Sequence, residues 1–238
     1  MENKSRLLVV EDETPIRTGL IDVFVFHGFD VDFAVDGLTG LEKSLTGNYD
    51  LILLDVMLPG MNGFDVCERI RAADRQQPVI MLTAKSADED VILGLSLGAD
   101  DYVAKPFSVA QLVLRVQAVL RRVSPRGEAL AFLELDQNVN VDVRNLSADV
   151  RGEQVAFTRR EMEMLEYLYA HSSAPVSREE LLNKVWGYPK DTDIETRTVD
   201  MHIAKLRRKI EADPATPTYL RTVRGAGYRL FIDAARGA

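Results

Sequence analysis

The stretch LILLDVMLPGMNGFD, residues 51–65, decides the fold of the first half of the chain. A continuous apolar run ends at Asp55, and a turn containing proline and glycine then leads into an amphipathic segment. An apolar run without polar alternation is typical of a strand in a parallel sheet that helices cover on both faces. The stretch therefore predicts a buried strand with a carboxylate at its carboxyl end, followed by a helix.

The same rhythm continues on both sides of this stretch. Five apolar segments alternate with five amphipathic ones, which favours a doubly wound, five-stranded parallel α/β sheet. The expected strands are Leu7–Val10, Val31–Val35, Leu51–Leu54, Val79–Leu82 and Tyr102–Ala104. The expected helices are Pro15–His27, Leu38–Leu45, Gly63–Ala72, Asp88–Leu97 and Val109–Arg122. Thr14 before Pro15 predicts a capping residue followed by proline at the first helical position.

The pattern changes after residue 123. The segment RRVSPRGEALA, residues 121–131, breaks the helical pattern and predicts a linker at 124–130 between domains 1–123 and 131–238. Short alternating segments, including Val139–Val143 and Gln154–Phe157, predict an antiparallel sheet. The expected helices are Arg159–His171, Arg178–Val185 and Thr196–Ile210, and the expected final hairpin is Leu220–Val223 with Tyr228–Ile232. The second half is therefore expected to be an α+β domain.

The composition indicates a globular protein in a reducing compartment. The 238 residues include one cysteine, Cys67, which excludes an internal disulfide and is expected to be a small buried hydrophobic residue. No apolar run approaches the roughly 20 residues that a membrane span needs, and the N-terminus does not resemble a signal peptide. We expect a soluble, cytoplasmic protein without a membrane partner.

The net charge of −8 argues at first against nucleic acid as a partner. The charge is unevenly distributed, however, because residues 197–229 contain 8 Lys and Arg against 3 Asp and Glu. A basic patch of this kind near the C-terminus could contact phosphate.

Functional side chains follow the carboxyl ends of the expected parallel strands, where open α/β sheets place their chemistry. They are Glu11 and Asp12 after the first strand, Asp55 at the end of the third, Thr83 at the end of the fourth and Lys105 after the fifth. Clustered carboxylates repel one another unless a cation intervenes, and oxygen ligands favour Mg²⁺. A carboxylate beside Mg²⁺ and a lysine can attack a phosphoryl donor, which would form an aspartyl phosphate.

Residues 1–123 resemble a receiver domain of two-component signalling through LLVVEDE, LILLDVMLPGMNGFD, PVIMLTA and GADDYVAKPF. The resemblance implies that a sensor histidine kinase phosphorylates Asp55 and that the Lys105–Pro106 bond is cis. It implies that Lys105 contacts the phosphoryl group and that Thr83 and Tyr102 act as switch residues. Mg²⁺ would be bound by Asp12, Asp55 and the main-chain carbonyl of Met57, with Glu11 holding a metal-bound water.

The resemblance also implies a symmetric dimer of phosphorylated receivers. The charges expected at the dimer interface are Asp100, Asp101, Arg115 and Arg122. A further charge pair of the family is missing, because Val91 and Gln111 occupy its positions.

The helix expected at Thr196–Ile210 has an apolar side and a basic side. The residues expected to pack inward are Val199, Ile203, Leu206 and Ile210. On another side lie Arg197, Met201, Ala204, Lys205 and Arg208, with Asp200 and His202 flanking them. An exposed basic helix can enter a major groove, and Gly225 and Gly227 permit a tight turn from which Arg224 could reach a minor groove.

Residues 130–233 resemble the winged-helix effector of the OmpR/PhoB family through FTRREMEMLEYL, VSREELLNKVWGY and TRTVDMHIAKLRRKIE followed by YLRTVRGAGYRL. By this resemblance the residues that face bases are Arg197, Asp200, Ala204 and Lys205. Those that contact or support phosphates are Thr198, His202 and Arg208. The loop Trp186–Ile194 resembles a segment that touches RNA polymerase. Ala204 departs from the larger polar residues common at its position, so the target sequence cannot be transferred from relatives.

Together these features predict a phosphorylation-dependent transcriptional regulator that binds duplex DNA. One alternative is a phosphohydrolase with Asp55 as nucleophile, although such an enzyme normally has an acid two residues on, where this chain has Met57. A second alternative is a regulator that acts only through protein contacts, which the basic helix and Arg224 argue against. A role with RNA is disfavoured because no aromatic stacking platform is evident.

Overall fold

The computed structural model describes residues 4–83, 98–120, 131–188 and 196–232. The chain divides into two compact units, Met1–Ser124 and Pro125–Ala238. The linker predicted at 124–130 lies outside the described residues. Within the described part of the chain, no helix is both long and apolar enough to cross a membrane.

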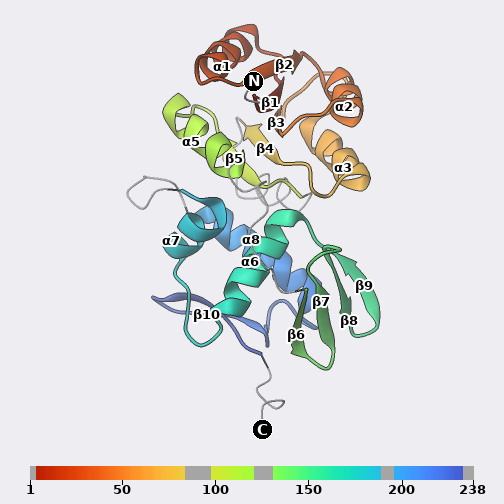
Figure 1. The fold of residues 1–238 in the computed structure, drawn as a ribbon, viewed down its shortest axis with the longest axis vertical. Helices are drawn as coiled ribbons and strands as arrows, with labels where there is room; N and C mark the ends of the chain where they lie inside the picture. The colour runs from red at the N-terminus through yellow and green to blue at the C-terminus, as the bar shows by residue number, and fades with distance from the viewer. Residues whose placement is uncertain (1–3, 84–97, 121–130, 189–195, 233–238) are drawn as a thin grey trace. The chain divides into compact units, whose positions relative to one another are not determined.

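The first unit is a parallel sheet with strand order β2-β1-β3-β4-β5. Its strands are β1 (Arg6–Val10), β2 (Asp30–Ala34), β3 (Leu51–Asp55), β4 (Val79–Thr83) and β5 (Asp101–Ala104). Figure 1 shows α1 (Thr14–Phe26) and α5 (Val109–Leu120) on one side of the sheet, and α2 (Gly37–Thr46) and α3 (Gly63–Ala73) on the other. This confirms the predicted doubly wound fold. The helix predicted at 88–97 lies outside the described residues.

The core of this unit follows from the apolar runs of the sequence. All five residues of β3 and of β4 are buried, as expected for central strands that helices cover on both faces. Leu20 and Phe24 of α1 pack onto the same core as Leu112 and Val116 of α5. Cys67 of α3 is buried and not part of a disulfide, in agreement with its expected role as a small hydrophobic residue.

The start of α1 differs from its prediction. Glu13, not Thr14, is the capping residue, and no side chain caps the helix. The hydroxyl of Thr14 instead accepts a hydrogen bond from Arg17 Nη2 at 3.1 Å. Arg17 Nη1 donates to the main-chain carbonyls of Glu11 and Asp12 at 2.9 and 2.8 Å. The threonine therefore helps to hold an arginine that braces the loop between β1 and α1.

The second unit has the architecture of a winged helix, as predicted. An antiparallel sheet comes first, with the strands β6 (Phe132–Asp136), β7 (Val139–Asp142), β8 (Ser147–Val150) and β9 (Glu153–Ala156) in sequential order. The helices α6 (Arg159–Ala170), α7 (Arg178–Leu181) and α8 (Arg197–Ile210) follow, and the antiparallel hairpin of β10 (Leu220–Val223) and β11 (Gly227–Leu230) comes last (Figure 1).

The helix predicted at Arg178–Val185 is not uniform. After α7 the chain enters a π-helical turn, η1 (Leu182–Trp186), which ends at Gly187 with a φ of 76°. The N–H of Tyr188 closes this end by donating to the carbonyl of Leu182 at 3.2 Å. The turn ends with the Trp186 side chain fully buried, 5.0 Å from the His202 ring in an edge-to-face arrangement.

Candidate functional site

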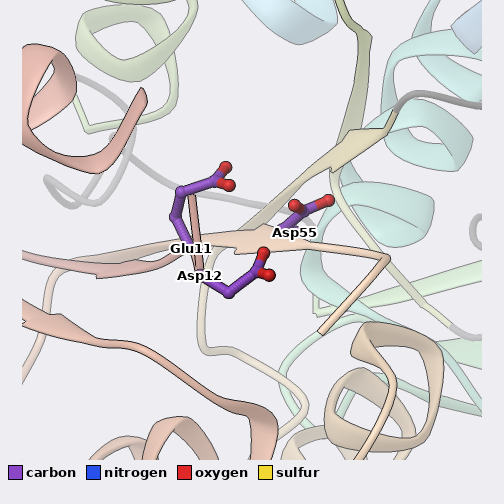
Figure 2. A group of neighbouring side chains, drawn as sticks. All are labelled: Glu11, Asp12 and Asp55. Atoms are coloured by element: carbon purple, nitrogen blue, oxygen red, sulfur yellow. The ribbon is translucent and has the colours of Figure 1, made fainter. Parts of the chain in front are cut away.

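Three carboxylates converge at the carboxyl ends of β1 and β3 (Figure 2). Oxygen atoms of Glu11, Asp12 and Asp55 lie within 4.8 Å of one another. Glu11 and Asp55 are buried, with 0% and 2% of their surface exposed, whereas Asp12 is exposed. Neighbouring parallel strands end at one edge of the sheet, and the structure brings these three residues together there.

Lys105 lies between the two buried carboxylates. Its Nζ donates hydrogen bonds to Glu11 Oε2 at 2.8 Å and to Asp55 Oδ2 at 2.7 Å. The Lys105–Pro106 bond that follows β5 is cis, as the resemblance implied. The other oxygen of Asp55, Oδ1, accepts a hydrogen bond from the N–H of Met57 at 3.2 Å. Each carboxylate oxygen of Asp55 therefore accepts one hydrogen bond, Oδ1 from the loop after β3 and Oδ2 from the loop after β5.

Burial and charge shift two pKa values in this pocket. The pKa of Glu11 is raised to about 7 by burial and by the charge of Asp55, against the opposing effect of its hydrogen bond from Lys105. Burial alone would lower the pKa of Lys105, but its hydrogen bonds to Asp55 and Glu11 outweigh burial and raise it. Two buried carboxylates thus share one ammonium, so the pocket retains an excess of negative charge.

This donor set fits a hard divalent cation. Three carboxylates from two strand ends supply only oxygen, which Mg²⁺ prefers, and the exposed Asp12 leaves one side open for water ligands. The pKa of Glu11 is raised by burial and, to a smaller extent, by the negative charge of Asp55.

Close packing fixes the backbone of Asp55. The N–H of Gly63, the first residue of α3, donates to the carbonyl of Val56 at 2.9 Å. A Cβ atom on Gly63 would overlap the main-chain carbonyl oxygen of Asp55, so only glycine allows α3 to begin this close to the end of β3. Sequence reasoning noted the glycine only as part of a motif, and it gave no role to Gly63 or to Arg17.

The expected switch residues lie on the two strands beside this pocket. Thr83 ends β4 and is 0% exposed, and its carbonyl accepts a hydrogen bond from the N–H of Lys105 at 2.6 Å. Tyr102 lies on β5, is 8% exposed, and pairs in register with Met81 of β4. Both expected switch residues are therefore buried on adjacent strands.

Three of the charged residues expected at a dimer interface form ion pairs within one receiver. Asp101 accepts a hydrogen bond from Arg115 Nη1 at 2.6 Å, and both residues are buried. Asp100 accepts from Arg71 Nη2 at 2.7 Å and from the N–H of Val79 at 2.8 Å. Arg122 and Val91 lie outside the described residues, and Gln111 is half-buried on α5.

The apolar side of α8 packs as predicted. Its buried residues include Val199, Ile203, Leu206 and Ile210, each with at most 1% of its surface exposed. On the expected basic side, Ala204 and Arg208 are exposed, whereas Met201 and Lys205 are buried. Lys205 Nζ lies 3.9 Å from Glu161 Oε1 of α6, which accounts for its inward position. The side chain of Arg197 is outside the described part of the structure.

Three other predicted DNA contacts differ in exposure. His202 is fully buried, and its Nδ1 lies 2.9 Å from the carbonyl of Thr198, itself 4% exposed. Burial lowers the pKa of His202 well below its usual value, so the ring is neutral. Asp200 is half-buried and accepts hydrogen bonds from two side chains outside α8. The segment 189–195 of the predicted polymerase-contacting loop lies outside the described residues.

Arg224 begins an exposed three-residue turn between β10 and β11. Gly225 and Gly227 adopt positive φ angles of 74° and 118°, which close the turn as their sequence positions predicted. Arg224 of this turn and Arg208 of α8 are thus both exposed basic residues.

Comparison with known proteins gives the two units their family. Residues 7–117 match the family described as Response regulator receiver domain, and residues 152–230 match Transcriptional regulatory protein, C terminal. Sensory transduction protein RegX3 of Mycobacterium tuberculosis is 41% identical over 94% of this chain and 98% of its own length. DNA-binding response regulator MtrA of Mycolicibacterium paratuberculosis is 42% identical over 95% of this chain and 98% of its own length.

Solved structures agree with this assignment. DrrB, an OmpR/PhoB homolog from Thermotoga maritima, is 29% identical with a TM-score of 0.51, covering 96% of this chain and 100% of the other. A mutant of RitR is 30% identical with a TM-score of 0.67, covering 95% of this chain and 98% of the other. The chain thus belongs to the OmpR/PhoB family of two-component response regulators, which are transcriptional regulators that join a receiver to a DNA-binding domain.

Proposed function

We propose that Asp55 accepts a phosphoryl group from a sensor histidine kinase and that this event controls binding of the second unit to promoter DNA. The observation that carries the proposal is the position of Asp55, buried at the end of β3 with Lys105 Nζ 2.7 Å from its carboxylate. An Asp55 oxygen would form the new bond to phosphorus while the bond to the donor breaks. Lys105 would then offset charge on the transferred oxygens.

The residues that would hold Mg²⁺ are Asp12, Asp55 and the main-chain carbonyl of Met57, with Glu11 holding a metal-bound water. When bound, Mg²⁺ supplies positive charge to the phosphoryl oxygens. The chain itself contributes the orientation of Asp55, because Met57 and Lys105 each donate to one of its two carboxylate oxygens.

The proposed switch runs from the pocket to the α5 and β5 surface. Thr83 would donate its hydroxyl hydrogen bond to the phosphoryl group, and Tyr102 would adjust its packing on β5 in response. The phosphorylated receiver would then form a homodimer whose interface includes Asp100, Asp101, Arg115 and Arg122. Asp101 and Arg115 are buried and pair with each other within one receiver, so the dimer would require them to exchange partners.

In the second unit α8 would enter the major groove and Arg224 the minor groove. Of the residues predicted to contact DNA, the exposed Arg208 and Arg224 support this role directly. The loop 186–194 would contact RNA polymerase. We further propose that residues 124–130 link the two domains and that the protein works in the cytoplasm. A phosphohydrolase remains the competing activity, and it requires turnover rather than a single stable modification.

Intact mass and sedimentation of wild type and Asp55→Ala, each with Mg²⁺ and acetyl phosphate, test the proposal. We expect wild type to gain one phosphoryl group and to dimerise, while the variant does neither. Multiple turnovers of the donor without accumulation of modified protein would favour the phosphohydrolase. Modification of Asp55→Ala to the same extent would exclude Asp55 as the acceptor.

A further inference from the structure

The wing of the second unit consists of β10, the turn 224–226 and β11. Its backbone is joined to the segment that precedes α7. The N–H of Val176 donates to the carbonyl of Tyr228 at 2.8 Å, and the N–H of Tyr228 donates to the carbonyl of Val176 at 2.9 Å. A Cβ on Gly227 would overlap the carbonyl oxygen of Val176, so the contact depends on a glycine there. One strand of the wing is thereby anchored at its backbone.

Side chains join this strand to α8 as well. The hydroxyl of Tyr228 donates to Asp200 Oδ1 at 2.6 Å, and Arg178 Nε donates to the same oxygen at 2.6 Å. Arg178 Nη2 also donates to the Tyr228 hydroxyl at 2.9 Å, and its guanidinium lies 4.7 Å from the centre of the tyrosine ring. Tyr228 is 4% exposed, and burial together with the hydrogen bond to Asp200 raises its pKa to about 12. The hydroxyl therefore keeps its proton and remains a donor.

The other strand of the wing is held from the same side of α8. Arg207 Nε donates to the carbonyl of Leu220 at 2.8 Å, and Arg207 Nη2 donates to Thr222 Oγ1 at 2.9 Å. Asp200 and Arg207 are seven residues apart, two helical turns, and so lie on one side of α8. Ala204 lies one turn from Asp200 on this side, Arg208 lies one turn further on the adjoining side, and both are exposed. The helix therefore holds the wing directly beside its exposed residues.

We propose that Asp200 and Arg207 are positioning residues that set the wing against α8, so that Arg224 and the exposed side of α8 reach one duplex together. This inference rests on the proposed DNA binding. It replaces the base contact predicted for Asp200 with a structural one, because its Oδ1 already receives two donors from outside the helix. Arg178 also offsets a negative charge that would otherwise face phosphates.

A double-mutant cycle on DNA affinity tests the inference. Tyr228→Phe removes only the hydroxyl that binds Asp200, and Arg224→Ala removes the wing contact to DNA. We expect Tyr228→Phe to weaken binding roughly threefold to tenfold, because it removes the hydrogen bond to Asp200 and the one that the hydroxyl accepts from Arg178. In the Tyr228→Phe background, Arg224→Ala should reduce DNA affinity by a clearly smaller factor than it does in wild type, because the wing is no longer held in place. The probe is a duplex selected by the wild-type protein from random sequence, measured by fluorescence anisotropy.

Two controls match this cycle. Tyr167→Phe removes a comparable hydroxyl, which donates to Glu180 Oε1 at 2.7 Å away from the wing, and should leave the effect of Arg224→Ala unchanged. Arg208→Ala probes the exposed side of α8. The binding free energy that it loses should add to the loss caused by Tyr228→Phe. Asp200→Asn repeats the cycle from the other partner, and thermal unfolding of each variant confirms that the domain is folded.

Two results would overturn the inference while leaving DNA binding intact. One is additivity of Tyr228→Phe and Arg224→Ala, which would mean that the wing is positioned without the hydroxyl. The other is an Asp200→Asn variant that changes preference at a single base pair and keeps the full Arg224 contribution, which would establish a direct base contact. If wild-type protein selects no duplex at all, the proposed DNA binding fails together with this inference.

Discussion

The ammonium of Lys105 lies between the carboxylates of Glu11 and Asp55, and burial raises the pKa of Glu11 to about 7 despite this ammonium. A buried acid with a raised pKa is protonated below that value and ionised above it. A cation bound nearby favours the ionised form, so proton release and cation binding are linked. Glu11 is therefore the residue through which pH would act on the pocket.

We expect Mg²⁺ affinity to rise with pH across the neutral range. At pH 6 Glu11 is mostly protonated and the cation must displace that proton, whereas at pH 8 it is already ionised. The apparent affinity should increase roughly threefold to tenfold between these values, as for linkage to one proton. Calorimetric titration with Mg²⁺ at both pH values measures this. Glu11→Gln, which cannot titrate, should abolish most of the pH dependence of Mg²⁺ affinity. An equal pH dependence in both proteins would contradict the attribution of this effect to Glu11.

Two basic residues of α8 should affect DNA binding in different ways. Lys205 is buried beside Glu161, whereas Arg208 is exposed. If Lys205 reads a base, Lys205→Ala costs about 1–3 kcal/mol on the preferred sequence and relaxes specificity at one position. Arg208→Ala should weaken binding to all DNA sequences alike. The salt dependence of the affinity should fall by the amount expected for about one phosphate contact. Binding of several duplexes over a range of salt separates the two, and a uniform loss for Lys205→Ala would assign it to phosphate.

At the scale of elements, the end of β3 and the start of α3 are packed with no space between them. Gly63→Ala places a methyl group against the carbonyl of Asp55. We expect a loss of about 1–3 kcal/mol in unfolding free energy from this overpacking, and slower phosphorylation because the backbone of Asp55 must move. Urea unfolding followed by circular dichroism, with intact mass for phosphorylation, measures both effects.

Gly19 supplies a matched control in the same domain. It lies exposed in the middle of α1, and a Cβ built there meets nothing within 4 Å. Gly19→Ala should stabilise the domain by about 0.5–1 kcal/mol through its better helix propensity, and leave phosphorylation unchanged. If both alanine variants behaved alike, close packing against Asp55 would not explain the glycine at position 63.

Much of this arrangement could be predicted from the sequence, because it depends on strand ends. Glu11, Asp12 and Asp55 meet since parallel strands place their carboxyl ends at one edge, and their positions after apolar runs were visible. The contacts of Arg17, which brace the β1–α1 loop, could not be predicted, because its partners are main-chain carbonyls whose positions depend on the folded loop. The π-helical turn Leu182–Trp186 could not be predicted from the spacing of apolar residues, because it changes the helical spacing for only one turn.

In α8, too, part of the arrangement could be predicted from the sequence and part could not. Its four buried aliphatic residues recur at helical spacing and were predicted correctly. Asp200 and Lys205 fall on the polar side by the same spacing, yet Asp200 binds Arg178 and Tyr228, and Lys205 approaches Glu161. Periodicity describes where a residue lies on its own helix, but it contains no information about which polar side chain of another element will reach it.

At the scale of the whole molecule, two units on one chain must respond to one modification. We expect phosphorylation to raise affinity strongly for a duplex with two half-sites, because a receiver dimer brings two DNA-binding units to one molecule of DNA. Linked binding of this kind can raise affinity by about 10²–10⁴ without a new contact. The same duplex cut to one half-site should gain little. Fluorescence anisotropy with and without acetyl phosphate compares the two, and an equal gain on both duplexes would exclude dimerisation as the basis of activation.

Trp186, the single tryptophan of the chain, lies in the second unit, and its ring is 5.0 Å from His202 of α8. Asp55, the proposed phosphoacceptor, belongs to the first unit. Tryptophan fluorescence of the unlabelled protein, excited at wavelengths that tyrosine does not absorb, is therefore an optical reporter located in one domain while the chemical input is applied to the other. Any change in its emission when only Asp55 is modified must have been transmitted between the domains, so the native chain allows that communication to be followed in real time.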